Sequence, residues 1–187
     1  MGLGPTWGYL TGERALPAAV LVAADRCGSV REGPCGSTWF AHRDHEGVLT
    51  GIDMRGPDWR GFAEDMDKSL FRLPGVPDVL TQLAVCDAPI DALSPAALES
   101  PRADTLYVSI TGGMGPLTLA CLDALLQGLA AHSEGVLVAA IDADAPGKRN
   151  AAHLAAMAQA AGVRSERLVP RGGQKDWNDA LKQGRGA

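Results

Sequence analysis

Short apolar runs alternate with longer segments of helical periodicity through the second half of the chain. The runs are almost continuously apolar, as expected of strands buried on both faces of a sheet. In the order strand, helix, strand, helix, we predict elements over residues 83–86, 90–98, 105–110, 117–131, 135–141, 148–161, 167–169 and 177–182. This alternation indicates an α/β fold, in which helices flank a parallel sheet.

The first half is rich in turns and has no sustained periodicity. We predict a short helix over 15–24, then strands over 37–42 and 47–53 joined by a polar hairpin turn. Residues 55–62 are predicted to form a loop.

Residues 73–77 hold two prolines and a glycine, a composition typical of a linker. We therefore predict two domains. A small α+β domain would occupy residues 1–77, and the α/β domain would occupy residues 78–187.

The composition narrows the class of protein. Of 187 residues, 46% are apolar and 21% charged, with a net charge of −5, which excludes general disorder. No apolar run reaches the roughly 18 residues of a membrane span, and the first residues lack the pattern of a secretory signal, so we expect a cytoplasmic protein. Its four cysteines show no CxxC spacing, which argues against a zinc ribbon. Because no secretory signal is seen, we expect reduced thiols. A mildly acidic chain needs a local basic patch or a bridging metal to bind nucleic acid.

Carboxylates follow three of the predicted strands. Asp87 and Asp91 come after the first strand, Asp142 and Asp144 after the third, and Asp176 after the fourth. A single aspartate in such a place is usually a helix cap or turn residue. Carboxylates converging at one sheet edge repel each other unless a cation neutralises them. Hard oxygen ligands favour Mg²⁺ or Mn²⁺.

Phosphate-binding groups are predicted beside these carboxylates, with an ordinary solvated surface as the alternative. The glycine-rich loop at residues 111–115 is either a phosphate cradle or a tight turn. His42 and His45 flank the hairpin turn, and we interpret them as solvated rather than as metal ligands. The predicted phosphate- or nucleic-acid-binding residues are Gly112, Gly113, Lys148, Arg149, Arg171 and Lys175.

Three motifs resemble those of the Toprim family. Residues 85–94 (VCDAPIDALS) resemble its first motif, residues 141–147 (IDADAPG) resemble its DxDxxG motif, and residues 175–181 (KDWNDAL) resemble the closing segment of plasmid-type, primase-like Toprim proteins. Residues 7–73 resemble the small domain that often precedes Toprim in proteins of plasmids and mobile elements. The resemblance implies a Toprim-like, Rossmann-like parallel sheet and Mg²⁺-dependent making or breaking of phosphodiester bonds.

The resemblance also implies roles for individual residues. Asp142 and Asp144 would bind the metal with support from Asp91, and Asp87 would be the general acid or base. The family usually has glutamate at position 87, and the shorter aspartate reaches less far, so metal binding could survive where catalysis fails. The predicted catalytic residues are Asp87, Asp91 and Lys175, the metal ligands Asp87, Asp91, Asp142 and Asp144, and the supporting residues Asp176 and Asn178.

The leading hypothesis is a primase-like nucleotidyltransferase of a plasmid or other mobile element, which joins nucleotides on single-stranded DNA during replication or transfer. The alternatives are a Toprim nuclease and a catalytically silent module that binds DNA or a protein partner. A helicase, a relaxase or a zinc-finger protein is the expected kind of partner. No membrane association is expected.

Overall fold

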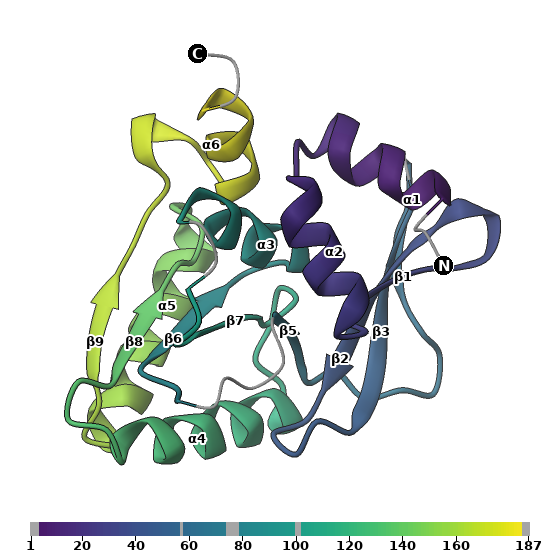
Figure 1. Cartoon of the computed structure of the whole chain (residues 1–187). Coiled ribbons are helices and arrows are strands. Elements are labelled where there is room, and N and C mark those ends of the chain that lie inside the picture. Colours follow the sequence, from purple (N-terminus) through teal and green to yellow (C-terminus); the bar gives the residue numbers. More distant parts are fainter. Residues whose placement is uncertain (1–3, 57, 74–78, 100–101, 185–187) are drawn as a thin grey trace.

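One sheet runs through both halves of the molecule (Figure 1). The computed structural model describes residues 4–56, 58–73, 79–99 and 102–184. The strands within these residues follow the order β4-β3-β2-β5-β7-β6-β8-β9, and β1 pairs with β2. Their bounds are β1 Val30–Glu32, β2 Thr38–Arg43, β3 Leu49–Arg55, β4 Arg60–Phe62, β5 Leu70–Leu73, β6 Gln82–Cys86, β7 Thr105–Ser109, β8 Val136–Ala139 and β9 Arg164–Arg167.

Helices cover both faces of this sheet. The α-helices are α1 Gly4–Gly8, α2 Ala18–Arg26, α3 Pro89–Leu98, α4 Pro116–Ala130, α5 Ala145–Ala160 and α6 Trp177–Gly184. A π-helix, η1 (Tyr9–Glu13), and two short 3₁₀ turns, η2 (Pro34–Gly36) and η3 (Arg171–Gly173), complete the described elements. None of the described helices has the length and apolarity needed to cross a membrane.

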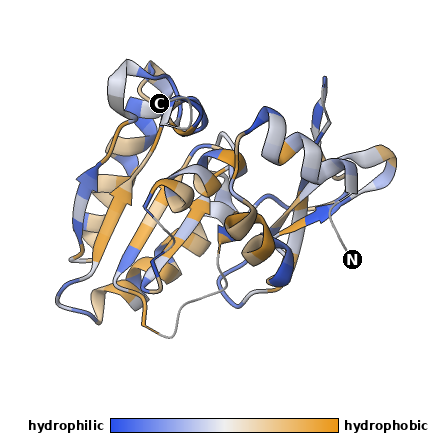
Figure 2. Cartoon of the chain, turned by 45° about the horizontal axis from the view of Figure 1, so that its top comes forward, coloured by the Kyte–Doolittle hydropathy of each residue, from blue (hydrophilic) through white to orange (hydrophobic). Residues whose placement is uncertain are grey.

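Strands β7, β6, β8 and β9 are parallel, which confirms the predicted α/β class. Side chains of β6 alternate between two cores: Leu83 and Val85 pack with α4 and α5, whereas Ala84 and Cys86 pack with α3 and α6. Figure 2 shows the hydrophobic colour concentrated along these central strands. Because both faces are covered, the strands read as continuous apolar runs in the sequence.

The N-terminal strands β1 to β4 pair antiparallel. Strand β5 joins them to the parallel part, because it pairs antiparallel with both β2 and β7. Leu73 of the predicted linker ends β5, and residues 74–77 lie outside the described residues. The division into two domains at residue 77 remains a prediction.

Several local predictions are wrong. The expected loop over 55–62 contains the end of β3 and the strand β4. The last strand is β9, which lies earlier than the predicted 167–169, because its four polar residues are all exposed at a sheet edge and give no apolar signal. Strands β1 and β5 are short and lie outside the predicted elements.

Two helix starts also differ from the prediction. Helix α2 begins at Ala18, because Pro17 has the extended backbone of an N-cap, with ψ of 145°. Helix α5 begins at Ala145, three residues before the predicted start, because the Asp144 side chain caps it. In both cases the capping residue determines the boundary.

Candidate active site

A cavity of about 650 Å³ lies where the N-terminal strands meet the carboxyl ends of β6 and β8. The C-terminal half contributes five carboxylates to its lining, from Asp87, Asp91, Asp142, Asp144 and Asp176. The N-terminal half contributes four cations, from Arg14, Arg55, Arg60 and Lys68. The cavity therefore combines groups that suit a divalent cation with groups that suit phosphate.

Strand ends and helix starts position the carboxylates. Asp91 lies in the first turn of α3, where the helix dipole favours negative charge. Asp144 is the N-cap of α5, and its Oδ1 accepts a hydrogen bond from the N–H of Gly147 at 2.8 Å. A Cβ atom at Gly147 would lie 2.2 Å from the carbonyl oxygen of Asp142. Only glycine therefore lets α5 start this close to the end of β8.

The Asp87 carboxylate connects two neighbouring strand ends. Its Oδ2 accepts a hydrogen bond from the N–H of Asp142 at 2.8 Å, and its Oδ1 accepts one from Nδ2 of Asn150 at 3.4 Å. Both oxygens of Asp87 thus bind groups of the protein itself. In this conformation, Asp87 stabilises the loop that carries Asp142.

Burial and mutual repulsion alter the acidity of this cluster. Burial, with the neighbouring Asp176 and Asp142 carboxylates, raises the pKa of Asp91 to about 7. Burial and the nearby carboxylates raise the pKa of Asp142 to about 6. Burial also raises the pKa of Asp87, although the hydrogen bond from Asp142 opposes the shift. Without a cation, Asp91 and Asp142 therefore retain protons at a pH where isolated aspartates are ionised.

Two residues of α6 connect the carboxylate cluster to neighbouring elements. Trp177 donates from Nε1 to the carbonyl oxygen of Ala140 at 2.9 Å, just before Asp142 in the chain. The N–H of Asn178 donates to Oδ1 of Asp91 at 3.3 Å, and its Nδ2 donates to the carbonyl oxygen of Arg14 at 2.7 Å. Asn178 thus links the N-terminal half to α3 and α6.

The donor set fits Mg²⁺ or Mn²⁺. Oδ1 of Asp142 is buried and has no hydrogen-bond partner among the described residues, so it is an oxygen available to a cation. Within those same residues, no three carboxylate, imidazole or thiol groups are gathered as the ligands of one ion. Mg²⁺ in proteins is commonly held by one or two carboxylates, with water and substrate phosphate completing the shell. Asp142, with Asp144 or Asp91, would hold the ion in this way.

The structure brings some of the predicted residues together and leaves others outside. Besides the five aspartates, Gly112 and Asn178 line the cavity. The N–H groups of Gly112 and Gly113 donate to the carbonyl oxygens of Asp87 and Ile110, so a phosphate at this loop would have to replace an internal hydrogen bond. The predicted cations Lys148, Arg149 and Lys175 are exposed, outside the cavity lining as the described residues define it. The Arg171 side chain lies outside what the structure describes. The functional roles of all these residues remain predictions.

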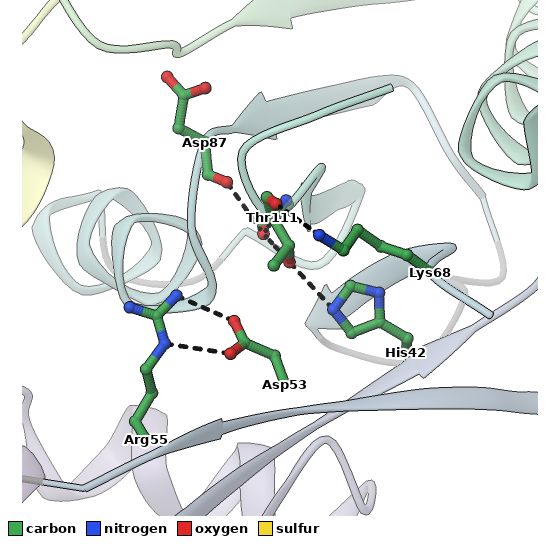
Figure 3. A network of polar contacts seen from close by, with 7 residues as sticks. His42, Asp53, Arg55, Lys68, Asp87 and Thr111 are labelled. Carbon is green, nitrogen blue, oxygen red and sulfur yellow. Dashed lines mark hydrogen bonds and ion pairs between the residues drawn. The ribbon is translucent and has the colours of Figure 1, made fainter. Parts of the chain in front are cut away.

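Two features of the site were missed in the sequence: a set of cations that line the cavity, and a buried histidine that contacts the lining residues Phe62 and Thr111. The first is the set of N-terminal cations, of which Arg55 is held by Asp53 through two hydrogen bonds of 2.9 and 3.1 Å (Figure 3). No local pattern shows that this set faces the carboxylates, since its position depends on how β5 pairs. The second is His42, which is wholly buried rather than solvated. Its place in the alternating strand β2, in register with the buried Thr38 and Phe40, is the signal that could have revealed it.

Comparison with protein families shows which family the chain belongs to. The family described as Toprim-like matches residues 84–181, more than half of the chain. The chain therefore belongs to the Toprim-like family, which confirms the resemblance seen in its motifs. Residues 8–75 match a family described as a protein of unknown function, DUF3991. None of the curated proteins is similar enough in sequence to count as a match.

Solved primase structures share the fold. The primase fragment of the bacteriophage T7 primase-helicase protein matches with a TM-score of 0.58 at 16% identity, over 93% of this chain and 68% of that one. The zinc-binding and RNA polymerase domains of Aquifex aeolicus primase give 0.62 at 13%, over 91% and 51%. A DnaG primase catalytic domain bound to single-stranded DNA gives 0.61 at 13%, over 98% and 71%. This chain thus spans about half of the Aquifex chain in that structure, and identities this low show the fold alone.

Proposed function

We propose that this chain is a primase-like nucleotidyltransferase that depends on Mg²⁺ or Mn²⁺ and extends nucleic acid on a single-stranded DNA template. One observation carries the proposal: a single cavity combines six carboxylates, five of them from the C-terminal half, with four cations. Nucleotidyl transfer needs groups of both kinds, since it brings a divalent ion and several phosphate charges together. The likeness to a DnaG catalytic domain bound to single-stranded DNA supports the choice of template.

The residues of the cavity would have separate roles in binding the ion and the phosphates. Asp142, with Asp144 or Asp91, would hold the divalent ion. When bound, that ion would orient the attacking oxygen and stabilise the charge on the leaving group. Arg55 and Arg60 bind and orient phosphate oxygens, with the Arg55 guanidinium fixed by Asp53.

A silent binding module is the second candidate function. The hydrogen bonds that Asp87 accepts from Asp142 and Asn150 favour it, because they occupy the carboxylate that would otherwise act as general acid or base. Such a module would still bind the ion and the nucleic acid. It would lack the proton transfer that bond formation requires.

A primer-extension gel separates these functions. End-labelled DNA annealed to an unlabelled template is incubated with nucleotides and Mg²⁺ or Mn²⁺. The intact protein should lengthen the labelled strand, Asp142→Asn should not, and Asp123→Asn, on the exposed surface of α4, should behave as the intact protein. Shortened strands would instead identify a nuclease. Unchanged strands with retained DNA binding would identify the silent module.

The proposal also covers the partners of this protein and its location in the cell. The T7 primase fragment comes from a primase-helicase protein, and the Aquifex structure contains a zinc-binding domain. These parallels support a helicase or a zinc-finger protein as partner. A relaxase is the partner expected in plasmid or mobile-element transfer. A cytoplasmic location accords with action on replicating DNA.

A further inference from the structure

His42 is a buried histidine that the proposed chemistry does not use. Its side chain is fully buried on β2 and packs edge-on against the ring of Phe62, with centroids 5.1 Å apart. Burial lowers the pKa of His42 to about 4, so the ring is neutral at physiological pH. Its Nε2 lies 2.9 Å from the hydroxyl of Thr111, across the junction between β2 and the loop after β7 (Figure 3).

Thr111 holds an unfavourable backbone conformation at the edge of the cavity. Its φ is +46°, a left-handed value that a β-branched residue rarely adopts. Besides the contact with His42, its carbonyl oxygen accepts a hydrogen bond from Nζ of Lys68 at 3.4 Å. Contacts from the N-terminal half thus hold this strained residue where it lines the cavity.

The contacts continue from Thr111 to the carboxylates. The Thr111 hydroxyl lies 3.2 Å from the Ser109 hydroxyl, which donates to the carbonyl oxygen of Asp87 at 3.5 Å. The same carbonyl oxygen accepts from the N–H of Gly112 at 3.0 Å. The Asp87 carboxylate in turn accepts from the N–H of Asp142. A continuous path therefore joins β2 to the end of β8.

The contact between His42 and Thr111 does not depend on the tautomer of the ring. Nδ1 of His42 has no hydrogen bond of normal geometry among the described residues, whereas a hydrogen bond with the backbone of Ser69 raises the pKa of the ring against the effect of burial. Nε2 donates to the Thr111 hydroxyl in one tautomer and accepts from it in the other.

The geometry points to His42 as a positioning residue that acts through Thr111. It holds the loop after β7 against β6 and so sets the backbone of Asp87 and Asp142. The link to metal binding rests on the proposed function, whereas the link to backbone order at Asp142 does not.

Hydrogen–deuterium exchange of the metal-free chain tests the positioning directly. Thr111→Val removes the hydroxyl but keeps the branched shape, Thr111→Ser keeps the hydroxyl, and His42→Phe removes Nε2 but keeps an aromatic ring. Thr81→Val is the matched control. The Thr81 hydroxyl donates to the Asp104 carboxylate, and Thr81 directly precedes β6, at the end of that strand opposite to Asp87.

We expect exchange at the Asp142 amide to become about fivefold to tenfold faster in Thr111→Val and His42→Phe. It should remain near the wild-type rate in Thr111→Ser and Thr81→Val. Wild-type exchange at Asp142 in Thr111→Val would overturn the assignment. So would equally fast exchange in Thr111→Ser, which would assign the effect to the backbone strain.

Mn²⁺ titration extends the test to the ion. Thr111→Val should weaken Mn²⁺ binding about tenfold, as loss of a group that supports metal ligands commonly does, and Thr111→Ser should restore it. If the wild-type chain binds no Mn²⁺, the proposed function fails, and the exchange rates alone decide the role of His42. Unchanged Mn²⁺ affinity with faster exchange would overturn the link to metal binding.

Discussion

The carboxylate of Asp87 accepts a hydrogen bond from the backbone N–H of Asp142 at 2.8 Å, between residues 55 positions apart in the sequence. The contact joins the ends of two adjacent parallel strands, β6 and β8. It makes the geometry of Asp142 depend on a residue whose predicted role was acid–base chemistry.

Removing this contact should destabilise the fold. Asp87→Ala leaves the N–H of Asp142 without its acceptor, and we expect the free energy of unfolding to fall by about 1–3 kcal/mol. Asp87→Asn retains an acceptor oxygen and should lose less. Urea unfolding measures both. Equal stability of Asp87→Ala and the wild type would show that the contact contributes nothing in solution.

Stability should depend on pH through Asp91. Its folded pKa of about 7 is raised above that of an unfolded aspartate, so the stability it contributes is complete below about pH 4 and is lost as the pH rises through 7. The pKa of His42 is lowered, so its effect is the opposite: the stability it contributes is lost as the pH falls below about 6.5. The pH dependence of the wild-type stability is therefore compared with that of Asp91→Asn, which retains His42.

Between pH 5 and pH 8, the metal-free wild type should lose about 2 kcal/mol of unfolding free energy relative to Asp91→Asn. Urea unfolding with a chelator present measures this difference. Asp123→Asn, on the exposed surface of α4, should follow the wild type. Parallel pH profiles for the wild type and Asp91→Asn would contradict the raised pKa.

Gly147 should tolerate no side chain. An added Cβ would meet the Asp142 carbonyl oxygen at 2.2 Å, so Gly147→Ala should lower the unfolding free energy by roughly 2 kcal/mol or more. Gly128→Ala is the matched control, because a Cβ there meets nothing within 4 Å. This change within α4 should stabilise the chain by about 0.5–1 kcal/mol. Similar effects of the two substitutions on thermal unfolding would argue against the tight start of α5.

The cations of the N-terminal half should bind nucleic acid. Arg60→Ala should weaken binding of single-stranded DNA and reduce the slope of log affinity against log salt by about 0.7. Arg26→Ala, exposed on α2 outside the cavity lining as described, should leave that slope unchanged. Fluorescence anisotropy at several salt concentrations distinguishes them. A larger loss in Arg149→Ala than in Arg60→Ala would return phosphate binding to the cations predicted from the sequence.

The parallel part of the fold was predictable because burial leaves a strong local signal. Strands such as β6 and β8 are apolar on both faces, and parallel strands end at one edge of a sheet, so the sequence alone places Asp87 near Asp142. Strand β9 was misplaced because an exposed edge strand has no need of apolar residues.

The N-terminal contribution was not predictable from local patterns. Strand β5 has only four residues, yet its pairing with β2 and β7 decides which N-terminal side chains meet the carboxylates. Such long-range pairing leaves no mark near Arg55 or Arg60 in the sequence. The burial of His42 differs in this respect, because the alternation of buried residues along β2 could have predicted it.

The most direct test is calorimetric titration of Mn²⁺ into the wild type, Asp142→Asn and Asp123→Asn at pH 8, which lies above the pKa of both Asp91 and Asp142. The account predicts saturable binding to the wild type, binding at least tenfold weaker in Asp142→Asn, and unchanged binding in Asp123→Asn. Equal affinity in all three proteins, or no binding to the wild type, would contradict the assignment of this cavity as a divalent-ion site.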